Sequence, residues 1–203
     1  MDQNKGITAI TYNHLNLPVR ISFGSTKRID YLYDAAGTKI RKTVVNGSTT
    51  TTTDYSGNFI YENNVLKFIQ HAQGYVAHTL NSSNGSEFNY VYQYKDHLGN
   101  NRVSYAYDSD SNSVKIIDDN HYYPFGLEME FQETSKNSFS LSSTDQKVKI
   151  MQQPDSGYKY KFNGKELEED LGLNTYDYGA RNYDAALGRW MTVDPLSDFE
   201  NRQ

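Results

Sequence analysis

The stretch that decides the fold is R-I-D-Y-L-Y-D-A-A-G-T-K-I-R-K-T-V-V, residues 28–45. Its flanks alternate with the two-residue period of a β-strand. This period places six residues on one face: Ile29, Tyr31 and Tyr33 before the central residues of the stretch, and Ile40, Lys42 and Val44 after them. Two such flanks around one polar centre predict a pair of antiparallel strands.

The centre of this stretch, from Asp34 to Lys39, is typical of a tight turn. Gly37 tolerates the positive φ angle that a tight connection requires. The carboxylate of Asp34 can accept hydrogen bonds from backbone N–H groups of the turn, which is a physical reason for an acid directly after Tyr33. We therefore predict a β-hairpin.

The same order of Tyr, small polar turn, basic residue and β-branched or aromatic residues recurs along the chain. Copies start at Tyr12, Tyr33, Tyr94 and Tyr183, and a weaker copy starts at Tyr55. The first spacings are about 21 residues, which is too short for a repeat of paired helices. Cross-strand aromatic pairs contribute roughly 0.2 to 1 kcal/mol each, and the chain has 18 Tyr. The sequence predicts a mainly β fold of repeated antiparallel hairpins.

Two regions depart from the hairpin pattern. Residues 128–157 are mostly polar and have no sustained period of 2 or 3.6 residues, which predicts an irregular insertion. Residues 164–172, G-K-E-L-E-E-D-L-G, have acids near the start and Gly at the end. That arrangement is typical of one short helix.

Composition excludes several classes of function. No apolar run approaches the roughly 18 residues of a spanning helix, so no membrane span is expected. The N-terminal sequence MDQNKGITAI lacks a basic region followed by an apolar one, so we expect no signal peptide. The chain has no Cys, which excludes disulfides and thiolate nucleophiles. A net charge of -5 with scattered Lys and Arg argues against nucleic acid as a partner.

The five His form no HExxH-type pair, so neither a metal site nor another cofactor is expected. His97 in D-H-L-G and His121 in H-Y-Y-P are residues of the type used for acid–base catalysis. Neither has a Ser nucleophile in a recognisable frame, and we expect no catalysis from them.

Four blocks of sequence carry a family resemblance. The strongest is residues 176–196, Y-D-Y-G-A-R-N-Y-D-A-A-L-G-R-W-M-T-V-D-P-L; the others are D-H-L-G-N-N-R-V from 96, H-Y-Y-P-F-G from 121 and Y-K-F-N-G-K-E-L-E-E-D-L-G from 160. In this order they resemble the core region of the bacterial Rhs (YD-repeat) family. The residues that carry the match are Tyr33, Asp34, Gly37, Asp96, His97, Gly99, Arg102, Tyr122, Pro124, Gly126, Gly164, Tyr176, Tyr178, Gly179, Arg181, Tyr183, Asp184, Gly188, Arg189, Trp190, Asp194 and Pro195.

The resemblance implies a structural role. In that family, hairpins wind into a β-sheet that closes as a hollow shell around a toxin, so it implies part of a curled β-sheet shell. We expect hairpins over 1–127, the insertion over 128–157, the core signature over 158–197 and a tail over 198–203. The implied partners are the rest of a shell and a toxin cargo. The implied location is secreted or at the cell surface, with the chain cytoplasmic until export.

Self-cleavage in the family resembles the work of two carboxylates that share a proton. By resemblance, Asp194 is the candidate for one carboxylate, with Asp184 and Arg181 as possible neighbours. The family's cleavage box, an Asp-Pro-x-Gly about 20 residues beyond the first Asp-Pro, has no counterpart before Gln203. We therefore expect no enzyme activity and no toxin domain in this chain. Asp184 follows Tyr183 as Asp34 follows Tyr33, so a role as a turn acceptor is the alternative.

Two other functions stay open. Aromatic faces flanked by polar turns stack on sugars, so a surface module that binds carbohydrate through Tyr92 and Tyr94 is one alternative. These tyrosines are expected on both faces of the predicted strands, which favours the shell over the carbohydrate module. The other is an inactive remnant of a self-cleaving core. Unpaired sheet edges also predict self-association.

Overall fold

The computed structural model describes residues 2, 4–80, 85–108, 112–129, 137–141, 148–152 and 156–194, with only the backbone for 137–141 and 148–152. The chain divides into two compact units. The first consists of residues 1–66 and 166–203, and the second consists of residues 67–165.

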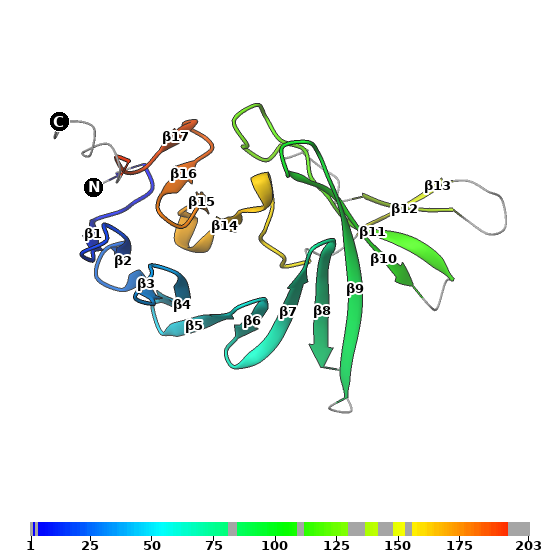
Figure 1. The fold of residues 1–203 in the computed structure, drawn as a ribbon, viewed down its shortest axis with the longest axis horizontal. Helices are drawn as coiled ribbons and strands as arrows, with labels where there is room; N and C mark the ends of the chain where they lie inside the picture. Colours follow the sequence, from blue (N-terminus) through cyan, green and yellow to red (C-terminus); the bar gives the residue numbers. More distant parts are fainter. Residues whose placement is uncertain are drawn as a thin grey trace. The chain divides into compact units, whose positions relative to one another are not determined.

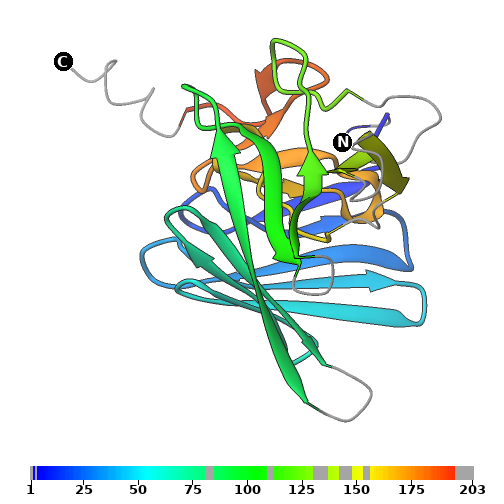
Figure 2. The same ribbon diagram turned by 90° about the vertical axis from the view of Figure 1, so that its right-hand side faces the viewer.

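The first unit contains a run of antiparallel strands that neighbour each other in chain order (Figure 1). They are β1 (Ala9–Tyr12), β2 (Pro18–Ser22), β3 (Lys27–Tyr33), β4 (Lys39–Asn46), β5 (Thr49–Ser56) and β6 (Phe59–Glu62). A four-stranded meander from the C-terminal part of the chain completes the unit, with β14 (Glu166–Glu168), β15 (Thr175–Asp177), β16 (Asn182–Asp184) and β17 (Arg189–Trp190). Within this unit, the orange strands of the meander lie beside the blue hairpins in Figures 1 and 2.

The second unit contains most of the green strands in Figure 1. They are β7 (Val65–His71, from Lys67 onward), β8 (Gly74–Leu80), β9 (Ser86–Lys95), β10 (Asn101–Asp108) and β11 (Ser113–Asp119), again antiparallel and in chain order. A separate pair joins β12 (Asn137–Leu141) to β13 (Val148–Gln152). The prediction of a mainly β fold built from antiparallel hairpins is confirmed.

Three turns share one hydrogen-bond pattern, centred on Asn13, Asp34 and Asp96. In each, the side-chain Oδ1 accepts from the backbone N–H groups two and four residues later, at 2.8 to 3.0 Å. The residue three positions on has positive φ and donates its N–H to the backbone carbonyl of the first. The expected roles of Asp34 as turn acceptor and Gly37 at positive φ are confirmed.

The turn at Asp34 shifts the register of β3 and β4. Tyr31 lies opposite Lys42, but Tyr33 lies opposite Lys39, so Ile40 is an extra residue of a bulge. Opposite residues of an antiparallel pair point to the same face. The bulge therefore places Lys39, rather than the expected Ile40, on the inner face together with Lys42.

Each unit has its own core. In the first, Ile29, Tyr31, Val44 and Leu173 are buried together, so the inward face predicted for this hairpin is confirmed apart from Ile40. In the second, Tyr75, Val91 and Tyr158 form the centre. In both cores a residue from the C-terminal part of the unit packs on the sheet.

The short helix predicted near 164–172 is wrong. Residues 166–168 form β14, between two single 3-10 turns, η1 (Phe162–Gly164) and η2 (Asp170–Gly172). Asn163, Gly164, Leu171 and Gly172 all have φ between +50° and +78°, which a right-handed helix excludes. The acids that resembled a helix start instead lie on an extended strand.

The irregular insertion predicted for 128–157 is also wrong in part, because 137–141 and 148–152 pair as the hairpin β12–β13. Alternation in S-F-S-L and V-K-I-M spans only a few residues, so it gives a weak signal. The remaining positions of this region that are described, 128–129 and 156–157, precede and follow it. No helix among the described residues is long and apolar enough to cross a membrane.

Candidate functional site

The most concentrated chemistry of the first unit surrounds the ammonium group of Lys39. Its Nζ contacts three carboxylates, at 2.9 Å from Glu166 Oε2, 2.6 Å from Glu168 Oε1 and 2.6 Å from Asp177 Oδ2. The lysine side chain is only 9% exposed. Glu166 and Glu168 are two residues apart on the extended strand β14, so both can reach the same inward lysine.

A second lysine extends this ionic cluster. Lys42 Nζ lies 2.8 Å from Asp170 Oδ2 and 3.5 Å from Glu166 Oε1. Two tyrosines complete it, because Tyr55 Oη donates to Glu166 Oε1 at 2.7 Å and Tyr31 Oη donates to Glu168 Oε2. We call Lys39, Lys42, Glu166, Glu168, Asp170, Asp177, Tyr31 and Tyr55 the ionic cluster.

Burial and charge act in opposite directions within the ionic cluster. Burial alone would lower the pKa of Lys39, but Glu168 and Glu166 outweigh it and hold that pKa well above its ordinary value. Burial would raise the pKa of Glu166, but Lys39 and Lys42 lower it to about 2. Burial, reinforced by Glu166, raises the pKa of Tyr55. Lys39 and Glu166 therefore keep their charges, and Tyr55 stays neutral, over the ordinary pH range.

Three carboxylates of the ionic cluster have the spacing of a possible metal site. One oxygen each from Glu166, Glu168 and Asp177 lies within 4.8 Å of the others. Lys39 Nζ already contacts all three, and an ammonium and a metal cation compete for the same oxygens. The arrangement fits a structural ion cluster that joins β14 and β15 to β3, β4 and β5.

Asp184, one of the two aspartates considered for self-cleavage, lies in a different environment. It is fully buried. Its Oδ2 is 2.9 Å from Lys5 Nζ, and its Oδ1 accepts from the N–H groups of Ala186 and Leu187. Lys5 also donates to the carbonyl of Leu173 at 2.6 Å. Asp184 thus acts as a turn acceptor and as an ion-pair partner for the N-terminal segment.

Asp194, the other aspartate, pairs with Arg181, whose Nη2 lies 3.0 Å from Asp194 Oδ2. The Arg181 guanidinium carbon is 4.2 Å from the ring centroid of Trp190, which is stacking distance. Trp190 in turn makes edge contacts with Tyr178 and Tyr183 at 5.0 and 5.3 Å. The two aspartates therefore have separate cationic partners, Lys5 for Asp184 and Arg181 for Asp194.

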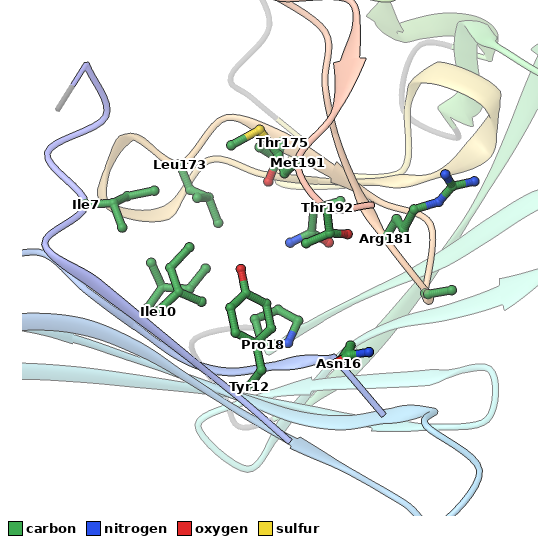
Figure 3. A pocket seen from close by; sticks show the side chains of 14 residues that line it. Ile7, Ile10, Tyr12, Asn16, Pro18, Leu173, Thr175, Arg181, Met191 and Thr192 are labelled. Atoms are coloured by element: carbon green, nitrogen blue, oxygen red, sulfur yellow. The ribbon is translucent and has the colours of Figure 1, made fainter. Parts of the chain in front are cut away.

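An apolar pocket lies next to this group in the first unit (Figure 3). It encloses about 460 Å³, counting the open mouth. Ile7, Ile10 and Tyr12 form one side, and Leu173 and Met191 lie opposite them in Figure 3. Among the described residues of its lining, Arg181 is the one charged residue, and there is neither a carboxylate nor a His. These described residues therefore offer no converging acid and base groups.

In the second unit, three of the sequence blocks meet. Asn163 N–H donates to Asn100 Oδ1 at 2.8 Å, which joins the block at 160 to the block at 96. A Cβ on Gly126 would lie 2.5 Å from the ring of Phe162, so only Gly fits where the block at 121 meets the block at 160. Gly164 lies next to Gly99 with room to spare, since a Cβ on Gly164 would be in ordinary van der Waals contact, at 3.7 Å, with the Gly99 carbonyl oxygen.

The two histidines of these blocks lie in different surroundings. His97 is exposed in the turn after Asp96. His121 Nε2 lies 3.3 Å from Asp119, and its Nδ1 lies 3.5 Å from Arg102. Arg102 also lies over the ring of Tyr122, whose hydroxyl donates to the carbonyl of Asn101. These contacts hold the strand ends in place.

The remaining residues of the sequence blocks have structural positions. Tyr176 is buried, and Tyr33 donates its hydroxyl to the carbonyl of Pro18. Gly179 and Gly188 have positive φ in the turns of the meander. Arg189 is exposed, Pro124 lies in the exposed turn before Gly126, and Pro195 lies outside the described residues.

Tyr92 and Tyr94, the residues considered for carbohydrate, do not lie on both faces of the sheet as expected. They share one face of β9 with Tyr90, and Tyr105 of β10 lies directly opposite Tyr92. All four side chains are exposed. Val91, which lies between Tyr90 and Tyr92 in the sequence, is buried on the opposite face of the sheet.

Sequence reasoning missed most of the ionic cluster. Neither Lys39 nor Glu166, Glu168 or Asp177 was singled out, and neither was Lys5. One signal was present: Lys42 interrupts an inward alternation of apolar residues between Ile40 and Val44. A lysine at such a position needs a buried acid, and the nearest concentration of acids in the sequence blocks is E-L-E-E-D at 166–170.

These features define the chain as an array of β-hairpins on which its own C-terminal segment is packed. No family model matches the sequence, and no curated protein matches it. Among solved structures, it is similar to a crystal structure of TcdB2–TccC3, with a TM-score of 0.59 and 17% identity over 94% of this chain. The crystal structure TcdB2–TccC3–TEV gives a TM-score of 0.60 at 17% identity and the same coverage.

A Tc holotoxin pore from Photorhabdus luminescens that carries a mutated TccC3 gives a TM-score of 0.57 at 16% identity over 93% of this chain. In each case the chain spans about 9% of the length of the chain it resembles. The likeness shows that the described fold is one found within the TcdB2–TccC3 proteins of a toxin complex.

Proposed function

We propose that this chain is a wall segment of an Rhs-type shell that encloses a toxin, secreted or displayed at the cell surface for competition between bacteria. The observation that carries the proposal is the likeness to TcdB2–TccC3 over 94% of the chain. The order and content of the blocks at 96, 121, 160 and 176, which resemble the Rhs core region, support it independently.

The segment is proposed to be non-enzymatic. A shared-proton mechanism needs two carboxylates in contact, whereas Asp184 pairs with Lys5 and Asp194 pairs with Arg181. The carboxylates of the ionic cluster are held by two buried lysines. These groups stabilise the packing of the C-terminal segment and leave no free general base among them.

Protection of a cargo tests the proposal. The chain would be expressed within its complete reading frame, and trypsin digestion of the polypeptide encoded downstream would be followed by mass spectrometry. We expect that polypeptide to resist digestion until the shell is unfolded. Digestion at the rate of the same polypeptide produced alone would contradict enclosure. A cut in the chain that Asp194→Asn abolishes would contradict the non-enzymatic role.

Carbohydrate binding is the second candidate, because Tyr92, Tyr94 and Tyr105 are exposed on one face. Aromatic faces of this kind can stack on sugar rings. It predicts retention on a glycan array that is lost when Tyr92 and Tyr94 are replaced by Ser. A wall segment without this activity predicts no retention for either protein.

A further inference from the structure

The apolar pocket of the first unit is bordered by a buried hydroxyl group. Thr175 of β15 belongs to its lining. The residue is 1% exposed, and its Oγ1 has no hydrogen-bond partner among the residues that the structure describes. Buried hydroxyl groups nearly always have a partner, because an unsatisfied one lowers stability. The Thr175 hydroxyl is therefore available to a ligand that enters the pocket.

The strand register explains why the described part of the meander offers Thr175 no acceptor. Thr175 lies directly opposite Glu168 of β14, so the two side chains point to the same face. Both oxygens of Glu168 are already used, since Oε1 accepts from Lys39 at 2.6 Å and Oε2 accepts from Tyr31. The carboxylate across from Thr175 is therefore committed to the ionic cluster.

The pocket has the size and the lining of a site for a small apolar ligand. It encloses about 460 Å³, counting the open mouth, and a closed cavity of about 150 Å³ already holds a benzene ring. Ile10 and Tyr12 of β1 lie on one side of it, and Leu173 and Met191 lie on the other (Figure 3). Ligand sites combine apolar walls of this kind with a few polar groups that fix orientation. A single ring or a short chain fits such a space.

The polar groups around the pocket favour an uncharged ligand. Arg181, the one charged residue in the described lining, is paired with Asp194 at 3.0 Å and stacked on Trp190. An anionic ligand would have to displace Asp194, and a cationic ligand would meet no carboxylate among the described lining residues. A hydroxyl or a carbonyl group on the ligand can pair with Thr175, because a threonine hydroxyl both donates and accepts hydrogen bonds.

We propose that this pocket binds a small uncharged molecule, made of an apolar ring or short chain with one oxygen group that hydrogen-bonds to Thr175. The inference goes beyond the role of a wall segment and does not depend on it. A single water molecule is a poorer occupant, because a buried water makes about three hydrogen bonds, and the side chains of Ile7, Ile10 and Leu173 offer none. Tyr12 is 41% exposed, so its hydroxyl reaches solvent, whereas the buried Thr175 gains a partner only from the ligand.

The test compares two probes of similar shape that differ in one hydroxyl group. Para-cresol and toluene would each be titrated into the full chain and followed by isothermal titration calorimetry. Methyl NMR of isotope-labelled methionine would locate the binding, because Met191 lines the pocket and Met129 belongs to the second unit. Para-toluate, which carries a carboxylate on the same ring, tests the preference for an uncharged ligand.

The variant for this test is Thr175→Val, which removes the hydroxyl and keeps a β-branched side chain. The matched control is Thr11→Val, at an exposed position of β1 outside the lining, between the lining residues Ile10 and Tyr12. Loss of an unpartnered buried hydroxyl should not destabilise the free protein, so the urea midpoint from Trp190 fluorescence should not fall. A fall in Thr175→Val alone would show that the hydroxyl is bonded within the protein and would overturn the proposal.

We expect para-cresol to bind the parent with a dissociation constant on the order of 0.1 to 1 mM, about fivefold more tightly than toluene. It should shift the methyl resonance of Met191 and leave that of Met129 in place. In Thr175→Val the two probes should bind within about twofold of each other, whereas Thr11→Val should keep the ratio of the parent.

Three results would overturn the proposal: no binding of para-cresol at millimolar concentration, equal binding of both probes to the parent, or a ratio that Thr175→Val leaves unchanged. Binding that does not shift Met191 would place the probe elsewhere and would also overturn it. Tighter binding of para-toluate than of para-cresol would assign the pocket to an anion held by Arg181 and contradict the uncharged ligand.

Discussion

The two units hold their C-terminal segments by different physics. In the first, residues 166–177 are packed on β3, β4 and β5 through the ionic cluster, with four carboxylates around two buried lysines. In the second, the ring of Tyr158 stacks on Tyr75 at 3.8 Å with planes 10° apart, and Phe68 meets both rings edge-on. In the neighbouring turns of that unit, Asn163 bonds to Asn100, and the buried Lys161 pairs with Glu128 at 2.6 Å.

The difference predicts different responses to change. Buried ions are costly to desolvate, and they are tolerated only while every partner is present. Stacked rings gain stability from area and contact, so their contribution falls gradually as atoms are removed. The first unit, with four carboxylates around two buried lysines, should therefore lose more stability than the second when one charge is removed, and its stability should depend more strongly on pH.

Removing the central charge of the ionic cluster is expected to have the largest effect. Lys39→Met keeps the length of the side chain but leaves Glu166, Glu168 and Asp177 without their common partner. Unpairing a buried charge costs about 3 to 5 kcal/mol. Trp190 is the single Trp and lies in the first unit, so its fluorescence during urea unfolding reports this loss.

The control for that change is Lys27→Met, at an exposed position of β3, which should stay within about 0.5 kcal/mol of the parent. Adding Glu166→Gln and Glu168→Gln to Lys39→Met should recover part of the loss, because the buried carboxylates are then neutral. If Lys39→Met were as stable as the parent, the carboxylates of Glu166, Glu168 and Asp177 would not depend on Lys39 to remain buried.

Truncation of the stacked pair tests the second unit. Tyr158→Ala removes a ring that is 7% exposed and should cost about 3 kcal/mol. Tyr158→Phe keeps the ring and loses a hydroxyl that accepts from Gln70 Nε2 at 3.4 Å, so it should cost less than about 1 kcal/mol. Hydrogen exchange of peptides from β7 and β8 measures both. Similar losses in the two variants would contradict a contribution dominated by stacking.

Low pH is expected to destabilise the first unit through the lowered pKa of Glu166. The pKa of Glu166 falls from 4.5 to about 2 on folding, so below pH 4.5 the unfolded chain binds more protons than the folded one and stability declines. The stabilisation from this carboxylate is present above pH 4.5 and lost as the pH falls to about 2. In Glu166→Gln this loss is absent, so the difference between parent and variant in Trp190 urea midpoints should narrow over that window. A constant difference would contradict the lowered pKa.

Alkali is also expected to destabilise the ionic cluster, by removing protons from its lysines and tyrosines. The pKa values of Lys39 and Lys42 are raised by their carboxylates, and burial raises those of Tyr31 and Tyr55. The folded state then binds more protons than the unfolded state above about pH 10. Stability of the first unit should decline from that pH upward, and Trp190 unfolding midpoints at pH 9 to 11 measure the decline.

The hairpins could be predicted from sequence because each depends on neighbours in the chain. The acceptor at Asp34, the positive φ at Gly37 and the alternation through Ile29 and Tyr31 are all local, and the structure confirms them. The helix expected at 164–172 failed for the complementary reason. In the local sequence, Glu166 and Glu168 have the pattern of a helix start. Their extended conformation on β14 lets both contact Lys39, which is far away in the chain.

The candidate site was predictable only in part. The block at 176–196 marks Arg181, Trp190 and Asp194, which the structure brings together, but its pattern does not show that Asp184 is paired with Lys5. Long-range pairs of this kind are set by the bulge at Ile40 and by strand order, and neither has a signature in composition. The exposed Tyr92 and Tyr94 could be picked out from sequence, but their placement on one face with Tyr105 depends on the register of β9 and β10.

Two matched glycines compare the units on the smallest scale. Gly37 and Gly99 occupy the same position of equivalent turns, with φ of +85° and +78°, so Ala in either place meets the same backbone strain, about 1 kcal/mol. The surroundings differ. A Cβ on Gly37 would lie 3.1 Å from Leu17 Cδ1, whereas a Cβ on Gly99 would find its nearest neighbour at 4.0 Å. Gly37→Ala should therefore cost more than Gly99→Ala by about 0.5 to 1 kcal/mol, the added cost of crowding a packed side chain.

Hydrogen exchange of β3 in Gly37→Ala and of β10 in Gly99→Ala measures the two losses of stability. Adding Leu17→Ala to Gly37→Ala should relieve the contact. Equal losses in the two turns would mean that backbone strain alone sets the need for glycine and that the packing of Leu17 adds nothing.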